Sequence, residues 1–310
     1  MVIAIRWRAG AAAVALMAAC AILYGAPPRV PTAEGLVYGE ADGVRLTMDY
    51  YRPKGPGPHP IAIIIHGGGY QRGDSKSDSE AYCADFLWPA GYAVFSVNYR
   101  LAPKYPYPYM VQDVERAVRY LRHNAKQWDA DPNRIALVGG SAGGFLSNMV
   151  GLLDSPGDPA ASDPVGRESA GAQAVVTLFA QSSFATVPLN ADVHALLDPL
   201  IARKGEAEAL KEASPITYVS KNAPPFLQIL GDRDGYIPFS EAVNLQAALE
   251  KLGVRCDIIR IPNGKHGTGR WHTVPGVPDW ERQMVEWLNA TLKHEGPIGG
   301  GIRPRMPAPQ

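Results

Sequence analysis

The stretch Gly139-Gly140-Ser141-Ala142-Gly143-Gly144 decides the fold of this chain. The apolar run 134–138 precedes it, and a helix-compatible stretch, 145–153, follows it. A strand, a G-x-S-x-G turn and a helix in this order are typical of a nucleophile elbow, which presents a serine on a sharp turn. Small neighbours are needed there because the turn strains the backbone and crowds the adjacent strand and helix. Taken alone, the motif also fits a glycine-rich turn with an idle serine.

A second glycine motif, His66-Gly67-Gly68-Gly69-Tyr70, follows the apolar run 61–65. This run is short, continuous and rich in β-branched residues, which favours a central strand buried on both faces. The glycines allow backbone N–H groups to approach a ligand closely, and such donors can hold the oxyanion of a tetrahedral intermediate. A phosphate-binding loop would need a Lys-Ser/Thr pair at the start of a helix, which this motif lacks. An HGGG-type loop together with a G-x-S-x-G elbow favours a serine hydrolase.

Three segments carry a resemblance to a known family: 66–69, 139–144 and Val97-Asn98-Tyr99-Arg100-Leu101-Ala102-Pro103. They resemble the α/β-hydrolase-fold esterases, above all the hormone-sensitive-lipase-like and the acetyl-xylan and feruloyl-esterase-like members. The resemblance implies an α/β-hydrolase catalytic domain over 35–295, with a mostly parallel central sheet and helices on both faces. Gly140 is a departure, because many relatives carry Asp or Glu before the serine. This difference concerns the tuning of pKa values and leaves the nucleophile in place.

Strands and helices alternate along the predicted domain. Strands are expected at 44–51, 61–65, 92–98, 135–138, 174–179, 226–230 and 257–261, and helices at 111–121, 145–153, 192–204, 240–252 and 279–293. The first of these strands alternates polar and apolar residues, as an antiparallel edge strand does. The pair Asp131-Pro132 is expected to close the helix that contains 111–121. Near-continuous apolar strands that alternate with helices predict a mostly parallel sheet covered on both faces.

Composition sets further limits on the class of protein. The chain has 310 residues, of which 46% are apolar, and this size fits one large domain or two small ones. Its net charge is zero, whereas a nucleic-acid-binding protein would show a basic stripe. We expect no nucleic-acid partner, no metal and no cofactor; the oligomeric state stays open. Cys83 and Cys256 fit either a disulfide or two free buried thiols, and the Gly- and Pro-rich tail 296–310 is expected to be disordered.

The N-terminal segment differs from the rest of the chain. Arg6 and Arg8 precede an apolar run over 9–26, which is typical of an export signal. We therefore expect segment 1–26 to direct the protein to the periplasm or out of the cell. Three outcomes stay open: cleavage at the end of the run, lipidation at Cys20, or retention of 9–26 as a membrane anchor. Met17 stands where a lipidation motif usually has Leu.

A serine hydroxyl is a weak nucleophile, so a base must lie within hydrogen-bond reach of Ser141. His266 lies in the segment 262–267, which directly follows the strand 257–261, and active-site groups gather at the carboxyl ends of parallel strands. His66 belongs to the glycine loop, where it fixes the loop more readily than it accepts the serine proton. His272 remains as an alternative base, or as a residue that lines the pocket.

The acid that orients the base should lie between Ser141 and His266, because this fold places its catalytic residues in the order Ser, acid, His. The segment Gly231-Asp232-Arg233-Asp234 follows the strand 226–230, and both aspartates are candidates. The resemblance favours Asp234, since relatives place the acid three residues after the glycine and before an apolar-Pro pair. Asp232 would then cap its own turn, a common role for aspartate.

These residues predict two-step acyl transfer with Ser141 as nucleophile, His266 as base and Asp234 as the orienting acid. The oxyanion is expected to be held by the N–H groups of Ala142, Gly68 and Gly69, with Gly67 as a hinge. The long connection 180–225 predicts a small cover segment over the site. Four aromatic residues are candidates to line the pocket: Tyr70, Phe184, Tyr236 and Trp271.

The short stretch upstream of His66 leaves no room for a large N-terminal cap, which predicts a site open to short-chain acyl esters. Together with export, this suits a small-molecule or carbohydrate ester, possible substrates being acetylated polysaccharides. An aryl-formamidase or a small peptidase would use the same triad on an amide. A hydrolase-fold binding protein that has lost activity is the alternative from another class, although such proteins typically lack one of the three catalytic residues. The natural ester stays open.

Overall fold

The computed structural model describes residues 29–294. The predicted export signal or anchor, 1–26, and the predicted disordered tail, 296–310, lie outside the described residues, so both stay predictions. Among the described residues, no helix is long and apolar enough to cross a bilayer. Cys83 and Cys256 are both buried and form no disulfide, which decides between the two alternatives that the sequence left open.

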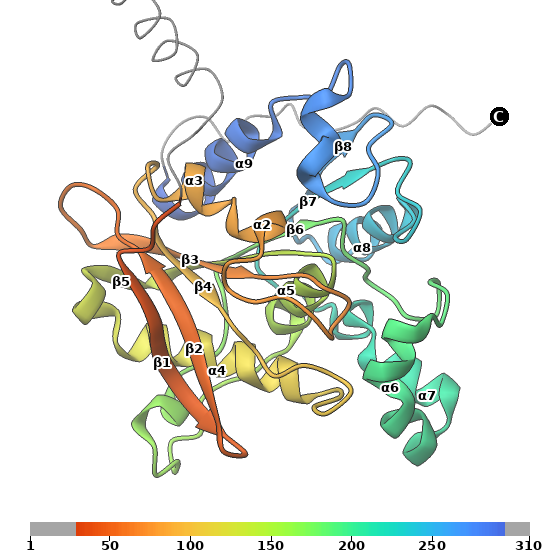
Figure 1. The fold of residues 1–310 in the computed structure, drawn as a ribbon, viewed down its shortest axis with the longest axis horizontal. Helices are drawn as coiled ribbons and strands as arrows, with labels where there is room; N and C mark the ends of the chain where they lie inside the picture. The colour runs from red at the N-terminus through yellow and green to blue at the C-terminus, as the bar shows by residue number, and fades with distance from the viewer. Residues whose placement is uncertain (1–28, 295–310) are drawn as a thin grey trace, which may run out of the picture. The chain divides into compact units, whose positions relative to one another are not determined.

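Eight strands form one sheet in the order β1-β2-β4-β3-β5-β6-β7-β8 (Figure 1). Their bounds are β1 Ala33–Ala41, β2 Val44–Tyr51, β3 His59–Ile65, β4 Ala93–Val97, β5 Ala130–Gly140, β6 Ala174–Leu178, β7 Phe226–Gly231 and β8 Cys256–Ile261. The β1–β2 and β2–β4 pairs are antiparallel, and the other five pairs are parallel. The prediction of a mostly parallel central sheet is therefore confirmed.

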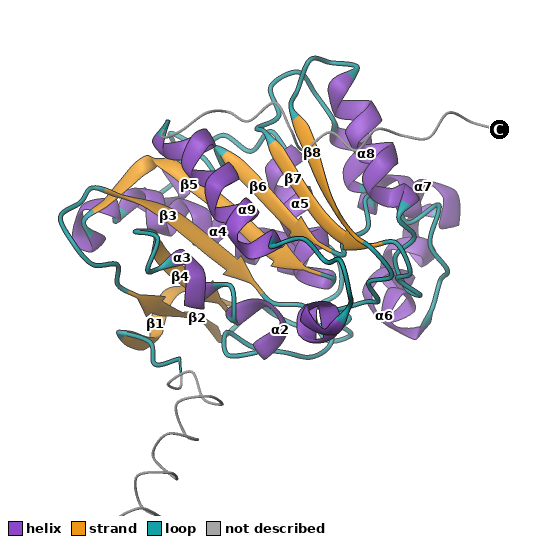
Figure 2. Ribbon diagram, turned by 90° about the horizontal axis from the view of Figure 1, so that it is seen from above, coloured by secondary structure: helices purple, strands orange, loops and turns teal. Residues whose placement is uncertain are grey.

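Strand β3 explains why the central strands are continuous apolar runs. All seven of its residues are buried. Successive side chains of a strand point to opposite faces, so Ile61 and Ile63 pack into one apolar cluster while Ala62 and Ile64 pack into a second. Helices lie on both sides of the sheet (Figure 2). Both faces of β3 are thus covered, and a polar residue at any of these positions would lose its water.

The helices of the described residues divide between the two faces. Their bounds are α2 Asp78–Ala81, α3 Ala84–Leu87, α4 Tyr109–His123, α5 Ala142–Leu152, α6 Ala191–Lys204, α7 Glu206–Ala213, α8 Ser240–Glu250 and α9 Trp280–Leu288. Buried residues of α4 and α5 belong to the first cluster, and those of α3 and α9 belong to the second. Helices α6 and α7 lie in the connection between β6 and β7, where the sequence predicted one helix in a cover segment.

Two expectations about individual elements are wrong. Strand β2 is not at the edge of the sheet, because β1 pairs with its outer side. Two irregularities interrupt the β1–β2 register, and β1 buries only Tyr38, so its sequence lacks a clear alternation. Helix α4 ends at His123, well before Asp131-Pro132. Asp129 takes a left-handed conformation (φ +51°) after a short 3-10 turn, and the chain enters β5 one residue later.

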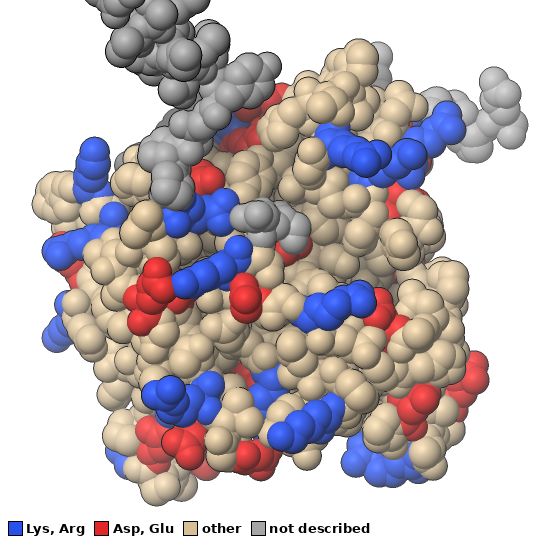
Figure 3. All heavy atoms as spheres, viewed as in Figure 1, with Lys and Arg blue, Asp and Glu red and all other residues tan. Residues whose placement is uncertain are grey.

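Charged side chains are interspersed on the face of the molecule in Figure 3, where Lys and Arg lie among Asp and Glu. No basic stripe crosses this face. The register of the sheet also matters for the site, because the parallel β3–β5 pair aligns Ile65 with Gly139. The glycine loop and the serine turn therefore leave the sheet side by side.

Candidate active site

Ser141 occupies a sharp turn between β5 and α5. Its backbone has φ +52° and ψ −119°, a conformation that residues with side chains rarely adopt. Close packing explains the glycines around it. A Cβ on Gly143 would overlap the carbonyl oxygen of Ile65, and one on Gly139 would overlap the carbonyl oxygen of Gly143. The turn is thus wedged against β3, with the serine hydroxyl at the carboxyl end of the sheet.

The structure brings Ser141, His266 and Asp234 into one hydrogen-bonded line. Nε2 of His266 lies 3.0 Å from Oγ of Ser141, and Nδ1 lies 2.7 Å from Oδ2 of Asp234. The other carboxylate oxygen, Oδ1, accepts the N–H groups of Tyr236 and Ile237 at 2.8 and 2.9 Å. The Asp234 side chain has no exposed surface. Hydrogen bonds to both oxygens therefore fix the orientation of the Asp234 carboxylate.

These contacts define which nitrogen of His266 carries a proton. An ionised carboxylate can only accept hydrogen bonds, so Nδ1 must donate to Asp234. Nε2 is then left as an acceptor for the Ser141 hydroxyl. This arrangement can remove the proton from Ser141 when its oxygen attacks, and Asp234 stabilises the imidazolium that results.

The alternative acid and base lie elsewhere. Asp232 accepts Nε of Arg260 at 2.8 Å and the N–H of Asn263 at 2.7 Å, so it ties the β7 loop to the β8 loop. The sequence suggested that Asp232 caps its own turn, and the structure shows these other partners instead. Nε2 of His272 lies 2.9 Å from a carboxylate oxygen of Glu281. Neither side chain lines the cavity beside Ser141.

The glycine loop after β3 curls back on itself. The carbonyl oxygen of Gly68 accepts the N–H groups of Gln71 and Arg72 at 3.2 and 3.1 Å. Gly68 and Gly69 have φ values of +112° and +59°, which glycine tolerates best. The N–H of Gly67 donates to Oε2 of Glu80 at 2.9 Å. Within residues 29–294, the backbone hydrogen bonds include none donated by Gly68 or Gly69, so these two groups can serve a ligand.

His66 supports the loop from below. Its ring stacks on Tyr99 with centroids 4.2 Å apart, and Nδ1 donates to the carbonyl oxygen of Gly67 at 2.7 Å. Nε2 is buried without a hydrogen-bond partner within residues 29–294. Burial lowers the pKa of His66 to about 4, because a charged ring would have no water around it. A neutral, packed His66 matches the structural role that the sequence assigned to it.

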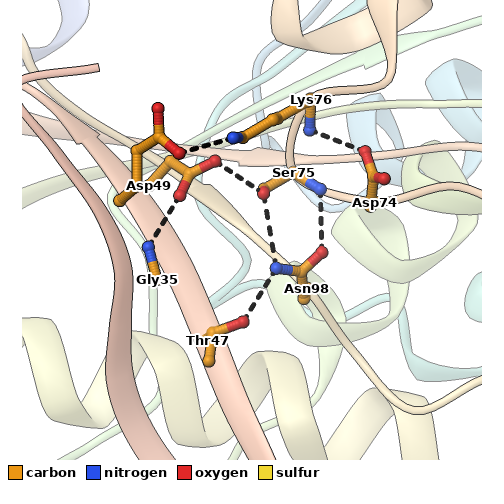
Figure 4. Close-up of polar contacts among 8 residues, drawn as sticks. Gly35, Thr47, Asp49, Asp74, Ser75, Lys76 and Asn98 are labelled. Atoms are coloured by element: carbon orange, nitrogen blue, oxygen red, sulfur yellow. Dashed lines mark hydrogen bonds and ion pairs between the residues drawn. The ribbon is translucent and has the colours of Figure 1, made fainter.

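A polar cluster holds the segment that follows the glycine loop (Figure 4). Ser75 donates from Oγ to Asp49 of β2 at 2.7 Å and from its N–H to Asn98 at 2.8 Å. Asp49 also accepts the N–H of Gly35 at 2.9 Å, and Asn98 donates to Oγ1 of Thr47 at 2.9 Å. Through this cluster, β1, β2 and the end of β4 anchor the far end of the loop.

A cavity of about 370 Å³ opens over Ser141. Its lining includes the oxyanion candidates Gly68, Gly69 and Ala142, two of the predicted aromatic residues, Tyr70 and Tyr236, and five polar side chains that the sequence did not single out: Arg72, Glu80, Gln181, Asn190 and Asp192. The last two come from the start of the cover segment. For Asn190 the sequence offers one signal, because Asn before a helix is a common N-cap. In the structure its side chain accepts the N–H groups of residues 192 and 193 at the start of α6.

Phe184 and Trp271 do not line this cavity, so the prediction for these two rings is wrong. Both are 1% exposed. Phe184 packs edge-on against Phe145 of α5. Trp271 packs edge-on against Phe179, whose ring contacts His266, and its Nε1 donates to the carbonyl oxygen of residue 265 at 2.8 Å. Both rings are buried because their apolar surface is more stable away from water. From the core they pack against residues that support the site.

The chain is similar in sequence to curated proteins that include esterases. Esterase LipC from Mycobacterium tuberculosis is 29% identical over 80% of this chain and 65% of its own length. The uncharacterized peptidase YuxL from Bacillus subtilis is 26% identical over 83% of this chain and 37% of its own length. The chain therefore spans about two thirds or less of the length of these curated relatives.

Solved structures match over a larger share of their length. An acetyl ester-xyloside bifunctional hydrolase from Caldicellulosiruptor lactoaceticus superposes with a TM-score of 0.75 and 28% identity, over 85% of this chain and 98% of that one. A carbohydrate esterase from gut microbiota gives a TM-score of 0.71 and 25% identity, over 87% and 99% of the two chains. The family model of BD-FAE matches residues 48–249. This match spans well over half of the sequence, and with the eight-stranded sheet it shows that the chain belongs to the BD-FAE family and has the α/β-hydrolase fold of esterases.

Proposed function

We propose that this protein is a serine carboxylic-ester hydrolase. The observation that carries the proposal is the line from Asp234 through His266 to Ser141, with contacts of 2.7 and 3.0 Å. A serine at φ +52° has a strained backbone, and such strain is typically kept where a functional site requires it. Membership in the BD-FAE family and similarity to named esterases support the same reaction.

The reaction proceeds in two halves through an acyl-enzyme. Oγ of Ser141 attacks the ester carbonyl carbon while Nε2 of His266 takes the hydroxyl proton. The N–H groups of Gly68, Gly69 and Ala142 stabilise the oxyanion that forms, and collapse of the intermediate expels the alcohol, which His266 protonates. Water then attacks the acyl-enzyme with the same base, which releases the acid and restores Ser141.

The preferred substrate is a short-chain acyl ester of a polar alcohol, such as an acetylated carbohydrate. A cavity of about 370 Å³ suits a small acyl group, and polar side chains from the loop and the cover segment contribute to its lining. Arg72, Gln181 and Asn190 can donate hydrogen bonds to hydroxyl groups. Similarity to an acetyl ester-xyloside hydrolase points to the same class of alcohol.

The test is a substrate panel applied to the wild type and Ser141→Ala. Acetyl and propionyl esters, acetylated sugars, a formyl anilide and peptide amides are compared by kcat/KM. Ser141→Ala should lose at least about 10⁴-fold on esters with an unchanged melting temperature, and a fluorophosphonate probe should label only the wild type. Full activity of Ser141→Ala would reject the mechanism. A preference for acyl chains of ten carbons or more would reject the substrate, and faster turnover of formyl or peptide amides would favour the formamidase or peptidase.

We also propose that the activity is exported, as segment 1–26 suggests. Fractionation of cells that express the full chain should place activity in the periplasm, the medium or the membrane. Removal of residues 1–26 should shift it to the cytoplasm. Cytoplasmic activity of the full chain would contradict this proposal.

A further inference from the structure

Glu80 is a buried carboxylate beside the candidate nucleophile that the mechanism above does not use. It lies on α2, a helix of only four residues that sits beside β3 and β5. It is 1% exposed and belongs to the lining of the cavity over Ser141. A carboxylate is expensive to bury and is retained only where hydrogen bonds compensate. Its contacts therefore need an explanation.

The two oxygens of Glu80 reach two different loops. Oε2 accepts the N–H of Gly67 at 2.9 Å. Oε1 lies 2.6 Å from the point that a Cβ on Gly140 would occupy, and 2.9 Å from the corresponding point on Gly67. The carboxylate thus fills the gap between the glycine loop and the residue before Ser141. Glycine is required at 140 because any larger residue would displace Glu80 or the ring of Phe179, 2.9 Å from the same point.

The glycine loop needs such an anchor. Three consecutive glycines have more backbone freedom than any other tripeptide, and oxyanion donors are effective only when they are already aimed before the reaction. The polar cluster around Ser75 fixes the loop on its far side, six residues beyond Gly69. The hydrogen bond to Gly67 is the corresponding contact on the near side, directly before the two donors.

We propose that Glu80 is a positioning residue for the oxyanion donors: by accepting the N–H of Gly67 and packing beside Gly140, it sets the directions of the Gly68 and Gly69 N–H groups toward Ser141. The proposal rests on the proposed ester hydrolysis. It assigns Glu80 no contact with the substrate and no proton transfer. What matters is an acceptor oxygen at the correct reach, whereas the negative charge is dispensable.

Two conservative variants separate reach from charge. Glu80→Gln keeps an acceptor at the same distance and removes the charge, so it should retain kcat within about fivefold. Glu80→Asp keeps the charge and is one methylene too short to reach Gly67, so kcat should fall about 10²-fold. KM for an acetyl ester should change by no more than about twofold, because oxyanion contacts form only in the transition state. The rate of fluorophosphonate labelling should fall with kcat.

A second approach comes from the other side of the contact. Gly140→Ala should lower kcat on its own, since the new Cβ pushes the carboxylate away. In the Glu80→Asp background the same substitution should cost less, because the shorter carboxylate has already left the space and only the contact with the Phe179 ring remains. Melting temperatures are measured for all variants, so that a kcat loss is compared only between folded proteins. Asp85→Asn, an exposed carboxylate on α3, is the matched control and should behave as wild type.

Three results would overturn the proposal. In the first, Glu80→Asp retains full kcat. In the second, Glu80→Gln is impaired as strongly as Glu80→Asp, which would assign the role to the charge. In the third, the loss appears only in KM. The Ser141→Ala variant is run in parallel: if it remains active, the proposed function fails as well, whereas an inactive Ser141→Ala with a fully active Glu80→Asp rejects only the role of Glu80.

Discussion

Two buried carboxylates flank Ser141, and they act on different kinds of partner. Asp234 follows β7 and contacts the side chain of His266, the proposed base. Glu80 lies on α2 and contacts the backbone of Gly67, which does not titrate. The same chemical group can therefore serve a proton transfer on one side and hold a loop on the other. Substitution by the amide distinguishes the two carboxylates: Asp234→Asn should lower kcat severely, whereas Glu80→Gln should lower it little.

The largest effect is expected from Asp234→Asn. The two backbone N–H groups that now bind Oδ1 will keep the amide oxygen, so the NH₂ group faces His266. Nδ1 must then accept, Nε2 carries the proton, and the base is blocked. We expect kcat for an acetyl ester to fall about 10⁴-fold. Asp232→Asn is the control and should lose only a few-fold; a loss of less than tenfold for Asp234→Asn would show that His266 is not oriented by this carboxylate.

The next effect concerns the loop that Glu80 holds. Gly68→Ala places a Cβ against the carbonyl oxygen of Arg72 and strains a backbone at φ +112°. We expect kcat to fall about 10²- to 10³-fold through loss of aimed N–H donors. Gly253→Ala is the matched control: it has φ +77° with open space around it, so it adds strain without touching the site. Equal kcat in the two variants would contradict a role for the loop.

The third prediction uses pH to test the buried His66 of the glycine loop. Burial holds the pKa of His66 at about 4 when folded, against 6.5 in the unfolded chain. Above pH 6.5 the ring is neutral in both states; as pH falls toward 4, the unfolded chain binds the proton first and the folded state loses stability. This difference in pKa corresponds to a loss of about 3 kcal/mol in the free energy of unfolding once the pH is below both values. Urea unfolding of the wild type and of His66→Asn is measured at pH 7 and 4.5. The free energy of unfolding should fall more in the wild type than in His66→Asn between these pH values, and an equal fall in both would argue against this pKa shift.

The smallest effect is expected at the far anchor of the loop. Ser75→Ala removes the donor to Asp49 and leaves a buried carboxylate oxygen short of one partner. We expect a loss of about 1–3 kcal/mol in the free energy of unfolding, measured in urea, with kcat nearly unchanged. A large fall in kcat with intact stability would instead place this anchor on a level with Glu80.

Much of the site could be predicted because its residues follow buried strands. Ser141 and His266 each lie in the turn or loop that follows a predicted strand, and such strands indicate where the chain leaves the sheet. The choice of Asp234 over Asp232 needed the resemblance to known esterases, since both follow β7 and both are aspartates. The structure gives the physical difference, because the Asp234 carboxylate reaches His266 whereas the Asp232 carboxylate reaches Arg260.

What escaped prediction depends on contacts between distant segments. Glu80 stands in a helix of four residues with no apolar periodicity, and its role arises from Gly67 and Gly140, 13 residues before it and 60 after it in the sequence. Phe184 and Trp271 were assigned to the pocket because they are aromatic and near the site in sequence, but burial in the core satisfies an apolar ring better. Strand β1 was missed because only Tyr38 is buried in it, so its sequence shows no clear alternation of polar and apolar residues.

The alignment of Ile65 with Gly139 has a consequence for how this protein can change. The proposed nucleophile and the proposed oxyanion donors of the glycine loop follow two neighbouring strands that are paired in register, whereas Asn190 and Asp192 lie in a connection outside the sheet. Insertions or substitutions in that connection can alter the alcohol that is recognised while the reacting atoms keep their spacing. Selection for a new ester should therefore collect its mutations between residues 180 and 225 and spare the two strands.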